Sequence, residues 1–462
     1  MPSRQDQLHS YQFTIQRVVS ALVMRETDPA QSPFRRLAGA ALASMLVAVI
    51  GLGGFALYGL FAGGGVKWRD GNAVIVEKES GARFVYREQR LHPVLNYASA
   101  LLIIGTERPR TVLVSRRSIE GVPRGLPLGI ADAPDSLPAA ARLATDRWTV
   151  CSIGTTDDGR PQSRSVLLIG TEGTDGRPLG EEALLLRAPD GRLHLLWQQR
   201  RHLIRDTDRV LAALAVTRAR AVPVAPALLN TVPTGLDLAP LHLPGLGERS
   251  ARVADARVGD VLLVSNSGGA RQYAVVLRDG LAGITELQAA LLLARTGQRE
   301  PDQISLGRFA ALPQLDDLTP TGPHAPPSAP PRLATMDSPA LCARVADEAG
   351  QVELRLGVEL PELITAPRAA RGQVAAVVAD HVLVEPGRGA LVESVAAPGA
   401  TGGAVSVVTD LGRRHVLADA GVPAMLGYGD ARPLRLPAGV VSLVPAGATL
   451  DPAIARQAAA PA

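Results

Sequence analysis

Hydrophobic residues are distributed very unevenly along this chain. Residues 37–66 contain no charged side chain, and residues 37–62 are mostly apolar. Because an α-helix needs about 20 such residues to cross the hydrocarbon core of a bilayer, the pattern predicts one transmembrane helix over 37–62. A cleaved signal peptide is the alternative. Its apolar region would be shorter, about 7–15 residues, and it would end in an A-x-A-like site, which the residues after Ala62 do not provide.

The charges that flank this span indicate its orientation. Arg35 and Arg36 stand directly before it, and basic residues outnumber acidic ones in the short N-terminal segment. Loops on the cytoplasmic side of a membrane carry an excess of Lys and Arg. We therefore expect a single-pass protein of the cell membrane with a cytoplasmic N-terminus and an extracytoplasmic C-terminal domain.

The segment before the span predicts one amphipathic helix. Its apolar residues recur at helical spacing with glutamines and arginines between them. The apolar face has no cytoplasmic domain of its own to pack against. It therefore lies on the membrane surface or docks onto a partner subunit, and the pattern leaves both open. The candidate docking residues are Tyr11, Ile15, Val18 and Leu22.

Small residues form one ridge of the predicted transmembrane helix. Such ridges allow two membrane helices to approach closely. The candidate packing residues are Ala40, Ser44 and Ala48.

Four segments after residue 62 share one pattern: an apolar strand, a Gly-containing turn, a second strand and a short apolar helix. In the fourth, Val405–Val408 and His415–Leu417 are taken as the two strands. The predicted fold is α+β and β-rich. The predicted divisions are a cytoplasmic helix (1–36), a transmembrane helix (37–62), repeat 1 (63–140), core segment 1 (141–180), repeat 2 (181–255), repeat 3 with a Pro-rich connector (256–335), core segment 2 (336–400) and repeat 4 (401–462).

The chain has only two cysteines, Cys151 and Cys342, and both lie in the predicted exterior part. Each falls in a core segment between two repeats, so the simplest organisation is a duplicated half. Two thiols in an oxidising compartment predict one disulfide that joins the two core segments. Two free buried cysteines are the alternative.

No sequence motif for catalysis, a cofactor or a metal is present. Neither Lys67 nor Lys78 follows glycine, which excludes a Walker A motif, and there is no G-x-S-x-G, H-E-x-x-H or C-x-x-C pattern. His194 lies within an apolar run and is interpreted as a hydrogen-bonded sheet residue. The net charge is only +4 and no basic run occurs, so we expect no nucleic-acid partner.

Several segments resemble a known family. They are Gln7–Val23, Leu91–Asn96, Gly129–Asp135, Trp148–Cys151 and Leu426–Tyr428. These segments are similar, in the same order and nearly from end to end, to EccB, the single-pass membrane subunit of actinobacterial type VII (ESX) secretion systems.

The resemblance implies a structural subunit in a membrane complex with an EccC motor, EccD and EccE type subunits and other copies of itself. Such a complex exports small helical substrate proteins. The resemblance also implies a propeller-like exterior domain of four repeats around a disulfide-linked centre. Some family members are called ATPases, so a nucleotide hydrolase is the alternative function. A module that binds the cell wall, with peptidoglycan as its partner, is a further alternative.

Overall fold

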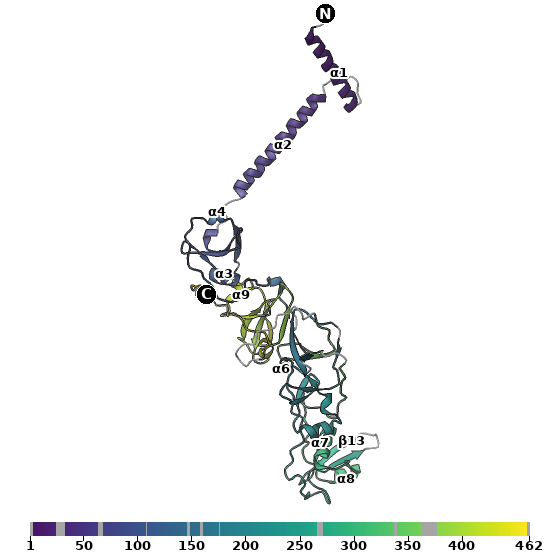
Figure 1. Cartoon of the computed structure of the whole chain (residues 1–462). Coiled ribbons are helices and arrows are strands. Elements are labelled where there is room, and N and C mark those ends of the chain that lie inside the picture. The colour runs from purple at the N-terminus through teal and green to yellow at the C-terminus, as the bar shows by residue number, and fades with distance from the viewer. Residues whose placement is uncertain are drawn as a thin grey trace. The chain divides into compact units, whose positions relative to one another are not determined.

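The computed structural model describes residues 3–24, 33–62, 68–107, 109–145, 148–157, 160–174, 176–265, 271–336, 340–361 and 377–459. The chain forms two compact units, Met1–Arg69 and Asp70–Ala462 (Figure 1). The first unit is helical, whereas the second is β-rich with short helices, as the sequence predicts.

The first unit contains two long helices, α1 (Arg4–Met24) and α2 (Pro33–Ala62). Ser3 begins α1, because its hydroxyl oxygen accepts from the backbone amide of Asp6, while the Asp6 carboxylate accepts from the Ser3 amide. The sequence also predicts that this helix stops near Asp28 and Pro29, because proline is poorly tolerated within a helix, and these two residues lie outside the described ones. Within α2, residues Ala38–Phe55 have a mean hydropathy of 2.0, and none of this stretch is buried inside the structure. Helix α2 is therefore long and apolar enough to cross a membrane.

The second unit contains four four-stranded sheets with one topology. In each, three consecutive antiparallel strands are followed by a short helix and a fourth strand, which pairs in parallel with the first. The connecting helix allows the chain to return to the same end of the sheet, which a parallel pair requires. The four sheets are called repeats 1 to 4 below.

The strands of each repeat have the following bounds. Repeat 1 contains β1 (Ala73–Glu77), β2 (Arg83–Arg87), β3 (Arg90–Pro93) and β4 (Arg110–Val114). Repeat 2 contains β8 (Leu184–Arg187), β9 (Leu193–Trp197), β10 (Arg200–Leu203) and β11 (Val222–Pro223). Repeat 3 contains β12 (Val261–Ser265), β13 (Arg271–Val276), β14 (Leu281–Ile284) and β15 (Asp302–Ile304). Repeat 4 contains β19 (Ala390–Val395), β20 (Ala404–Val408), β21 (Arg414–Val416) and β22 (Leu434–Pro437).

The helices of the second unit are short. Those between the third and fourth strands of the repeats are α3 (Tyr97–Ile104), α5 (Thr207–Ala213), α7 (Glu286–Thr296) and α9 (Val422–Met425). The others, with two 3-10 turns, are α4 (Arg116–Ile119), η2 (Ala140–Arg142), η3 (Arg218–Arg220), α6 (Pro226–Thr231), α8 (Leu306–Ala311), α10 (Ala438–Val441) and α11 (Pro452–Ala455). A further 3-10 turn, η1 (Trp68–Asp70), spans the boundary between the two units. Asn96 and Thr285 cap α3 and α7 through their side chains.

The prediction that Val405–Val408 and His415–Leu417 begin repeat 4 is wrong by one strand. They correspond to β20 and β21, the second and third strands of the sheet. The first strand is β19, which lies within the range predicted as core segment 2 and pairs with β20 and β22. The error has a physical origin: every repeat contains two successive hairpins, and a hairpin pattern alone does not say which of the two it is.

A fifth sheet joins the two predicted core segments. It has six strands in the order β18-β6-β5-β16-β17-β7. Strands β5 and β6 form one hairpin, β16 and β17 form another, and β5 pairs with β16 in antiparallel fashion. The strands are β5 (Thr149–Asp157), β6 (Arg160–Ile169), β7 (Arg177–Pro178), β16 (Ala340–Val345), β17 (Val352–Leu356) and β18 (His381–Val384).

Shared apolar clusters connect these sheets. One cluster contains Trp148 and Leu341 of the six-stranded sheet and its neighbours, together with side chains of repeats 2 and 4. A second cluster combines repeat 1 with repeat 4, and a third combines repeat 2 with Leu287 and Leu291 of repeat 3. These clusters connect the sheets in the series repeat 1, repeat 4, six-stranded sheet, repeat 2 and repeat 3.

Candidate functional site

The apolar face of α1 is exposed. The exposed fractions of the candidate docking residues are 65% for Tyr11, 42% for Ile15, 53% for Val18 and 78% for Leu22. Fully burying side chains of this size gains about 1.5–3 kcal/mol each. The helix therefore carries apolar area that its own chain leaves uncovered, as a docking face requires. The docking itself stays a prediction.

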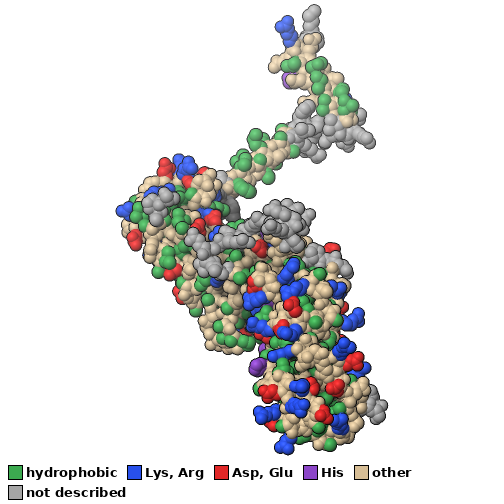
Figure 2. Space-filling view, turned by 60° about the horizontal axis from the view of Figure 1, so that its bottom comes forward, with side chains coloured by type: hydrophobic (Ala, Val, Ile, Leu, Met, Phe, Trp, Pro, Cys, Tyr) green, Lys and Arg blue, Asp and Glu red, His purple; other side chains and the backbone are tan. Residues whose placement is uncertain are grey.

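Apolar side chains cover the described part of α2 (Figure 2). The small residues Ala40, Ser44 and Ala48 are exposed on it. The Ser44 hydroxyl donates to the Ala40 carbonyl oxygen one turn earlier. Because that hydroxyl is satisfied within its own helix, it can face lipid or another helix. Packing of this ridge against a second helix stays a prediction.

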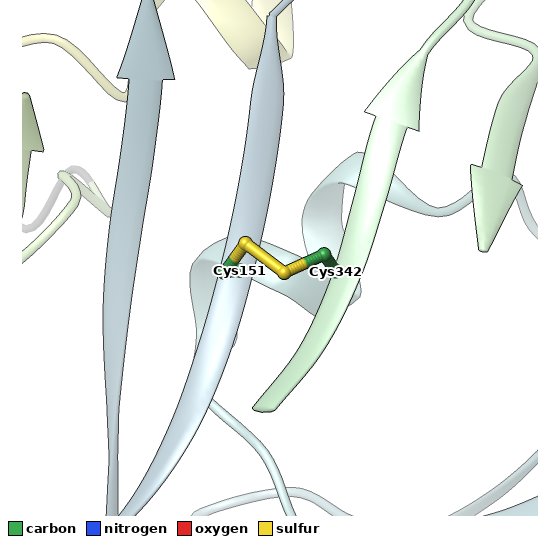
Figure 3. Close-up of a disulfide and its surroundings, with 2 residues drawn as sticks. All are labelled: Cys151 and Cys342. Carbon is green, nitrogen blue, oxygen red and sulfur yellow. A yellow bond between two sulfur atoms is a disulfide. The ribbon is translucent and has the colours of Figure 1, made fainter. Parts of the chain in front are cut away.

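The predicted disulfide between Cys151 and Cys342 is present. The two residues are directly opposite each other on β5 and β16, with their Cα atoms 4.0 Å apart (Figure 3). Both side chains are buried, and they pack with Val166, Leu168 and Val358 on one face of the six-stranded sheet. The bond therefore joins the two hairpins of this sheet at its centre, across 191 residues of sequence.

A histidine on the third strand fixes the loop that follows the fourth strand in three repeats. The Nδ1–H groups of His92, His202 and His415 donate to the carbonyl oxygens of residues 126, 236 and 448, at 3.0, 2.8 and 2.9 Å. Each ring lies against a glycine, and an added Cβ there would come within 2.1 to 2.3 Å of the ring. The glycines are Gly125, Gly235 and Gly447.

Burial is the first cause that lowers the pKa of both His202 and His415. These rings are therefore neutral at pH 7 and serve as hydrogen-bond donors to the loop. In the equivalent backbone pairing of repeat 3, Ala282 stands in place of the strand histidine and Leu315 in place of the loop glycine. The larger side chain is therefore on the loop in repeat 3 and on the strand in the other three repeats. Each histidine thus fixes a loop to the sheet of its own repeat, a role that its position in the sequence did not reveal.

Tyr428 connects repeat 4 to the chain that follows repeat 1. Its side chain is 1% exposed, and its hydroxyl donates to the Pro138 carbonyl oxygen at 2.7 Å. Burial raises the pKa of Tyr428, so the phenol stays protonated as this donor. Two segments 290 residues apart are thereby joined.

His194 lies on β9 as the sequence predicts, but its ring is not fully hydrogen-bonded. It is 5% exposed, and its Nδ1 has no partner. The adjacent pairs Asp316–Asp317 and Glu181–Glu182 lie on loops, with Asp317 accepting a backbone hydrogen bond from Gly283. Within the described ranges, no group of three or more His, Cys, Asp or Glu side chains is arranged to hold a metal ion.

A protein family matches almost the whole chain. The family is described as "Type VII secretion system ESX-1, transport TM domain B", and the match covers residues 1–461. The chain belongs to this EccB family. The resemblance found in the sequence is therefore confirmed.

Individual relatives agree with this assignment. The chain is 30% identical to the "ESX-3 secretion system ATPase EccB3" of Mycolicibacterium smegmatis, over 96% of this chain and 88% of the relative. Two solved structures are similar. One is a chain of an intact ESX-5 inner membrane complex, with a TM-score of 0.69, 25% identity and coverage of 100% of this chain and 96% of that one. The other is an EccB3 dimer from the ESX-3 core complex, with a TM-score of 0.64, 28% identity and coverage of 84% and 100%.

Proposed function

We propose that this EccB family chain is a structural core subunit of a type VII secretion membrane complex. The observation that carries the proposal is its architecture: a helix with a long uncharged apolar stretch lies in the chain between an exposed amphipathic helix and a large β-rich unit. Such a chain can connect a complex on one side of a membrane to contacts on the other. The similar chain within an intact ESX-5 inner membrane complex supports this role.

The proposed partners are EccC, EccD and EccE type subunits and other copies of this chain. Helix α1 would dock on a cytoplasmic partner, and the ridge of Ala40, Ser44 and Ala48 would pack within the membrane. The repeats would contact one another between protomers outside, which the dimer formed by a related EccB3 supports. Contact with peptidoglycan is a further proposal for the exterior unit.

The exterior unit is proposed to consist of four small repeats around a duplicated, disulfide-linked β core. The common topology of the four sheets and the paired hairpins of the central sheet support this organisation. The predicted segment limits and the propeller-like arrangement remain proposals. The apolar clusters described above connect repeat 1, repeat 4, the six-stranded sheet, repeat 2 and repeat 3 in series, so packed side chains join all parts of this unit.

The proposed topology has the N-terminus in the cytoplasm, since Arg35 and Arg36 precede the span. A reporter fused after Ala462 that is active only outside the cytoplasm should therefore give full activity. A reporter of the opposite kind should be inactive at that site and active when fused before Met1. The reverse pattern would contradict the proposed orientation.

The function itself is tested by deletion and co-purification. Deleting the gene should stop export of the small helical substrates, and re-expression of the chain should restore it. Tagged full-length chain should bring down the other membrane subunits from detergent extracts. Normal export without the chain would refute the structural role.

A nucleotide hydrolase is the second candidate, because the M. smegmatis relative is called an ATPase. Purified full-length chain should show no ATP turnover above a mock preparation if its role is structural. Turnover that co-elutes with the chain would favour the hydrolase instead. Co-sedimentation with purified peptidoglycan distinguishes the cell-wall module from both.

A further inference from the structure

Repeat 2 contains a cavity of about 400 Å³ between its sheet and helix α6. Strands β9 and β10 contribute polar and apolar side chains from one face of the sheet, and Pro226, Leu229 and Asn230 of α6 also line the cavity. Such a volume is within the range of small-molecule sites in proteins. The residues that matter for its chemistry are Asp190, His194, Arg201, Leu203, Leu229 and Asp237.

The charges in this cavity leave one cation unpaired. Asp190 forms an ion pair with Arg192 at 2.6 Å, and Asp237 forms one with Arg205 at 2.8 Å. Arg201 is half-buried, and its Nε–H donates to the Val232 carbonyl oxygen at 3.1 Å. Within the described part of the chain, Arg201 has no carboxylate partner. Its guanidinium therefore presents a positive charge that forms no ion pair with a described carboxylate.

A second polar group, buried beside the cavity, also lacks a partner. His194 faces the same side of the sheet as Arg201, because it pairs with Leu203 while Arg201 pairs with Leu196. Its buried Nδ1 makes no hydrogen bond. Burial is the first cause that lowers the pKa of His194, and the charge of Arg201 is the second, so the ring is neutral at pH 7. A buried polar atom without a partner costs about 1–3 kcal/mol, and such groups call for an explanation.

The rest of the lining is mainly apolar. Ala188, Leu203, Pro226 and Leu229 surround the two polar groups. A ligand for this cavity must therefore combine one negative charge with a small apolar body. Asp190 and Asp237 also line the cavity, and their carboxylates would repel a dianion such as a phosphate monoester more strongly than a monoanion. A single carboxylate matches one guanidinium in charge and in its two-pronged geometry.

We propose that the repeat 2 cavity binds a small monocarboxylate, whose carboxylate pairs with Arg201 and whose apolar body contacts Pro226 and Leu229. Two sources share this chemistry, the C-terminal carboxylate of a short peptide and a free short-chain fatty acid. None of its lining residues belongs to α1, α2 or the six-stranded sheet.

Ligand-observed NMR on detergent-solubilised full-length chain tests this proposal, with N-acetylalanine representing a peptide C-terminus and butyrate a free acid. Saturable binding of at least one probe is expected. Arg201→Gln should weaken that binding at least tenfold, whereas Arg218→Gln, which removes the same charge from an exposed side chain of repeat 2 that does not line the cavity, should not change it. Preference for one probe identifies the source of the carboxylate.

A second variant tests the cavity without changing Arg201, so that a folding defect caused by Arg201→Gln is not mistaken for loss of the site. Asn230 is exposed and lines the cavity from α6, so Asn230→Trp should close the cavity and abolish binding while Arg201 stays in place. The proposal is overturned if neither probe binds saturably or if Arg201→Gln and Asn230→Trp bind like the unmodified chain. It is also overturned if inorganic phosphate binds more tightly than both carboxylates.

Discussion

Replacing Ile15 and Val18 by aspartate is expected to abolish co-purification with the other membrane subunits and to stop secretion. The four apolar side chains of the α1 face are 42 to 78% exposed in the free chain, so docking can bury most of their area. Each gains about 1.5–3 kcal/mol on full burial, and together they would supply several kcal/mol after ordering costs. Two carboxylates in such an interface would lose this gain and add unpaired buried charge.

The matched control is Gln12→Asp with Gln16→Asp. It adds the same two charges to the same helix, but beside the apolar face rather than within it. Both double variants should remain inserted in the membrane with the disulfide formed. If α1 only lies on the membrane surface, Ile15→Asp with Val18→Asp should have a mild effect, because α2 already anchors the chain. Normal assembly and secretion by this variant would refute docking.

Features set by local sequence pattern could be predicted. The uncharged apolar stretch predicts α2 because it is long enough to cross a bilayer. The apolar residues of α1 recur at helical spacing within one continuous segment, so no distant contact is needed to recognise the helix. The first hairpins of repeats 1 to 3 follow from alternating strands around a turn. The disulfide is predictable because the chain has two cysteines and both lie in matching segments.

The third strands of repeats 1 and 2 could not be predicted in the same way. Their turns are Glu88-Gln89 and Gln198-Gln199, and all four residues have positive φ, between 43° and 64°. Tight hairpin turns need positive φ at both central residues, for which Asn-Gly is the usual signal. These turns adopt the conformation without glycine, so no turn signal separates the second strand from the third.

The fourth strands could not be predicted from the sequence for a different reason. Strand β11 has two residues and β15 has three, and each is fixed by parallel pairing with a strand about 40 residues earlier. The repeat 2 cavity depends on such distant contacts too, because α6 reaches it only after β11 returns beside β8. The sequence shows His194 within an apolar run but does not show that its ring lacks a hydrogen bond.

Loss of the disulfide is expected to lower the stability of the β-rich unit strongly. In the chain-entropy model, a bond across 191 residues restricts the unfolded chain by about 5 kcal/mol, and removal of native disulfides costs roughly 2–5 kcal/mol. Cys151→Ala with Cys342→Ala should therefore lower the midpoint of thermal unfolding by several degrees. The midpoint is measured by tryptophan fluorescence on the full-length chain in detergent. Membrane insertion should be unchanged, because α2 lies in the other compact unit.

Reduction provides the control for this prediction. A membrane-permeant phosphine should lower the midpoint of the unmodified chain to nearly that of the double variant, and should leave the variant's own midpoint unchanged. Alkylation of unreduced, denatured chain should label neither cysteine. Equal midpoints for the oxidised chain and the variant would mean that hydrogen bonds between β5 and β16, and the apolar cluster around Trp148, hold the two hairpins together without the covalent bond.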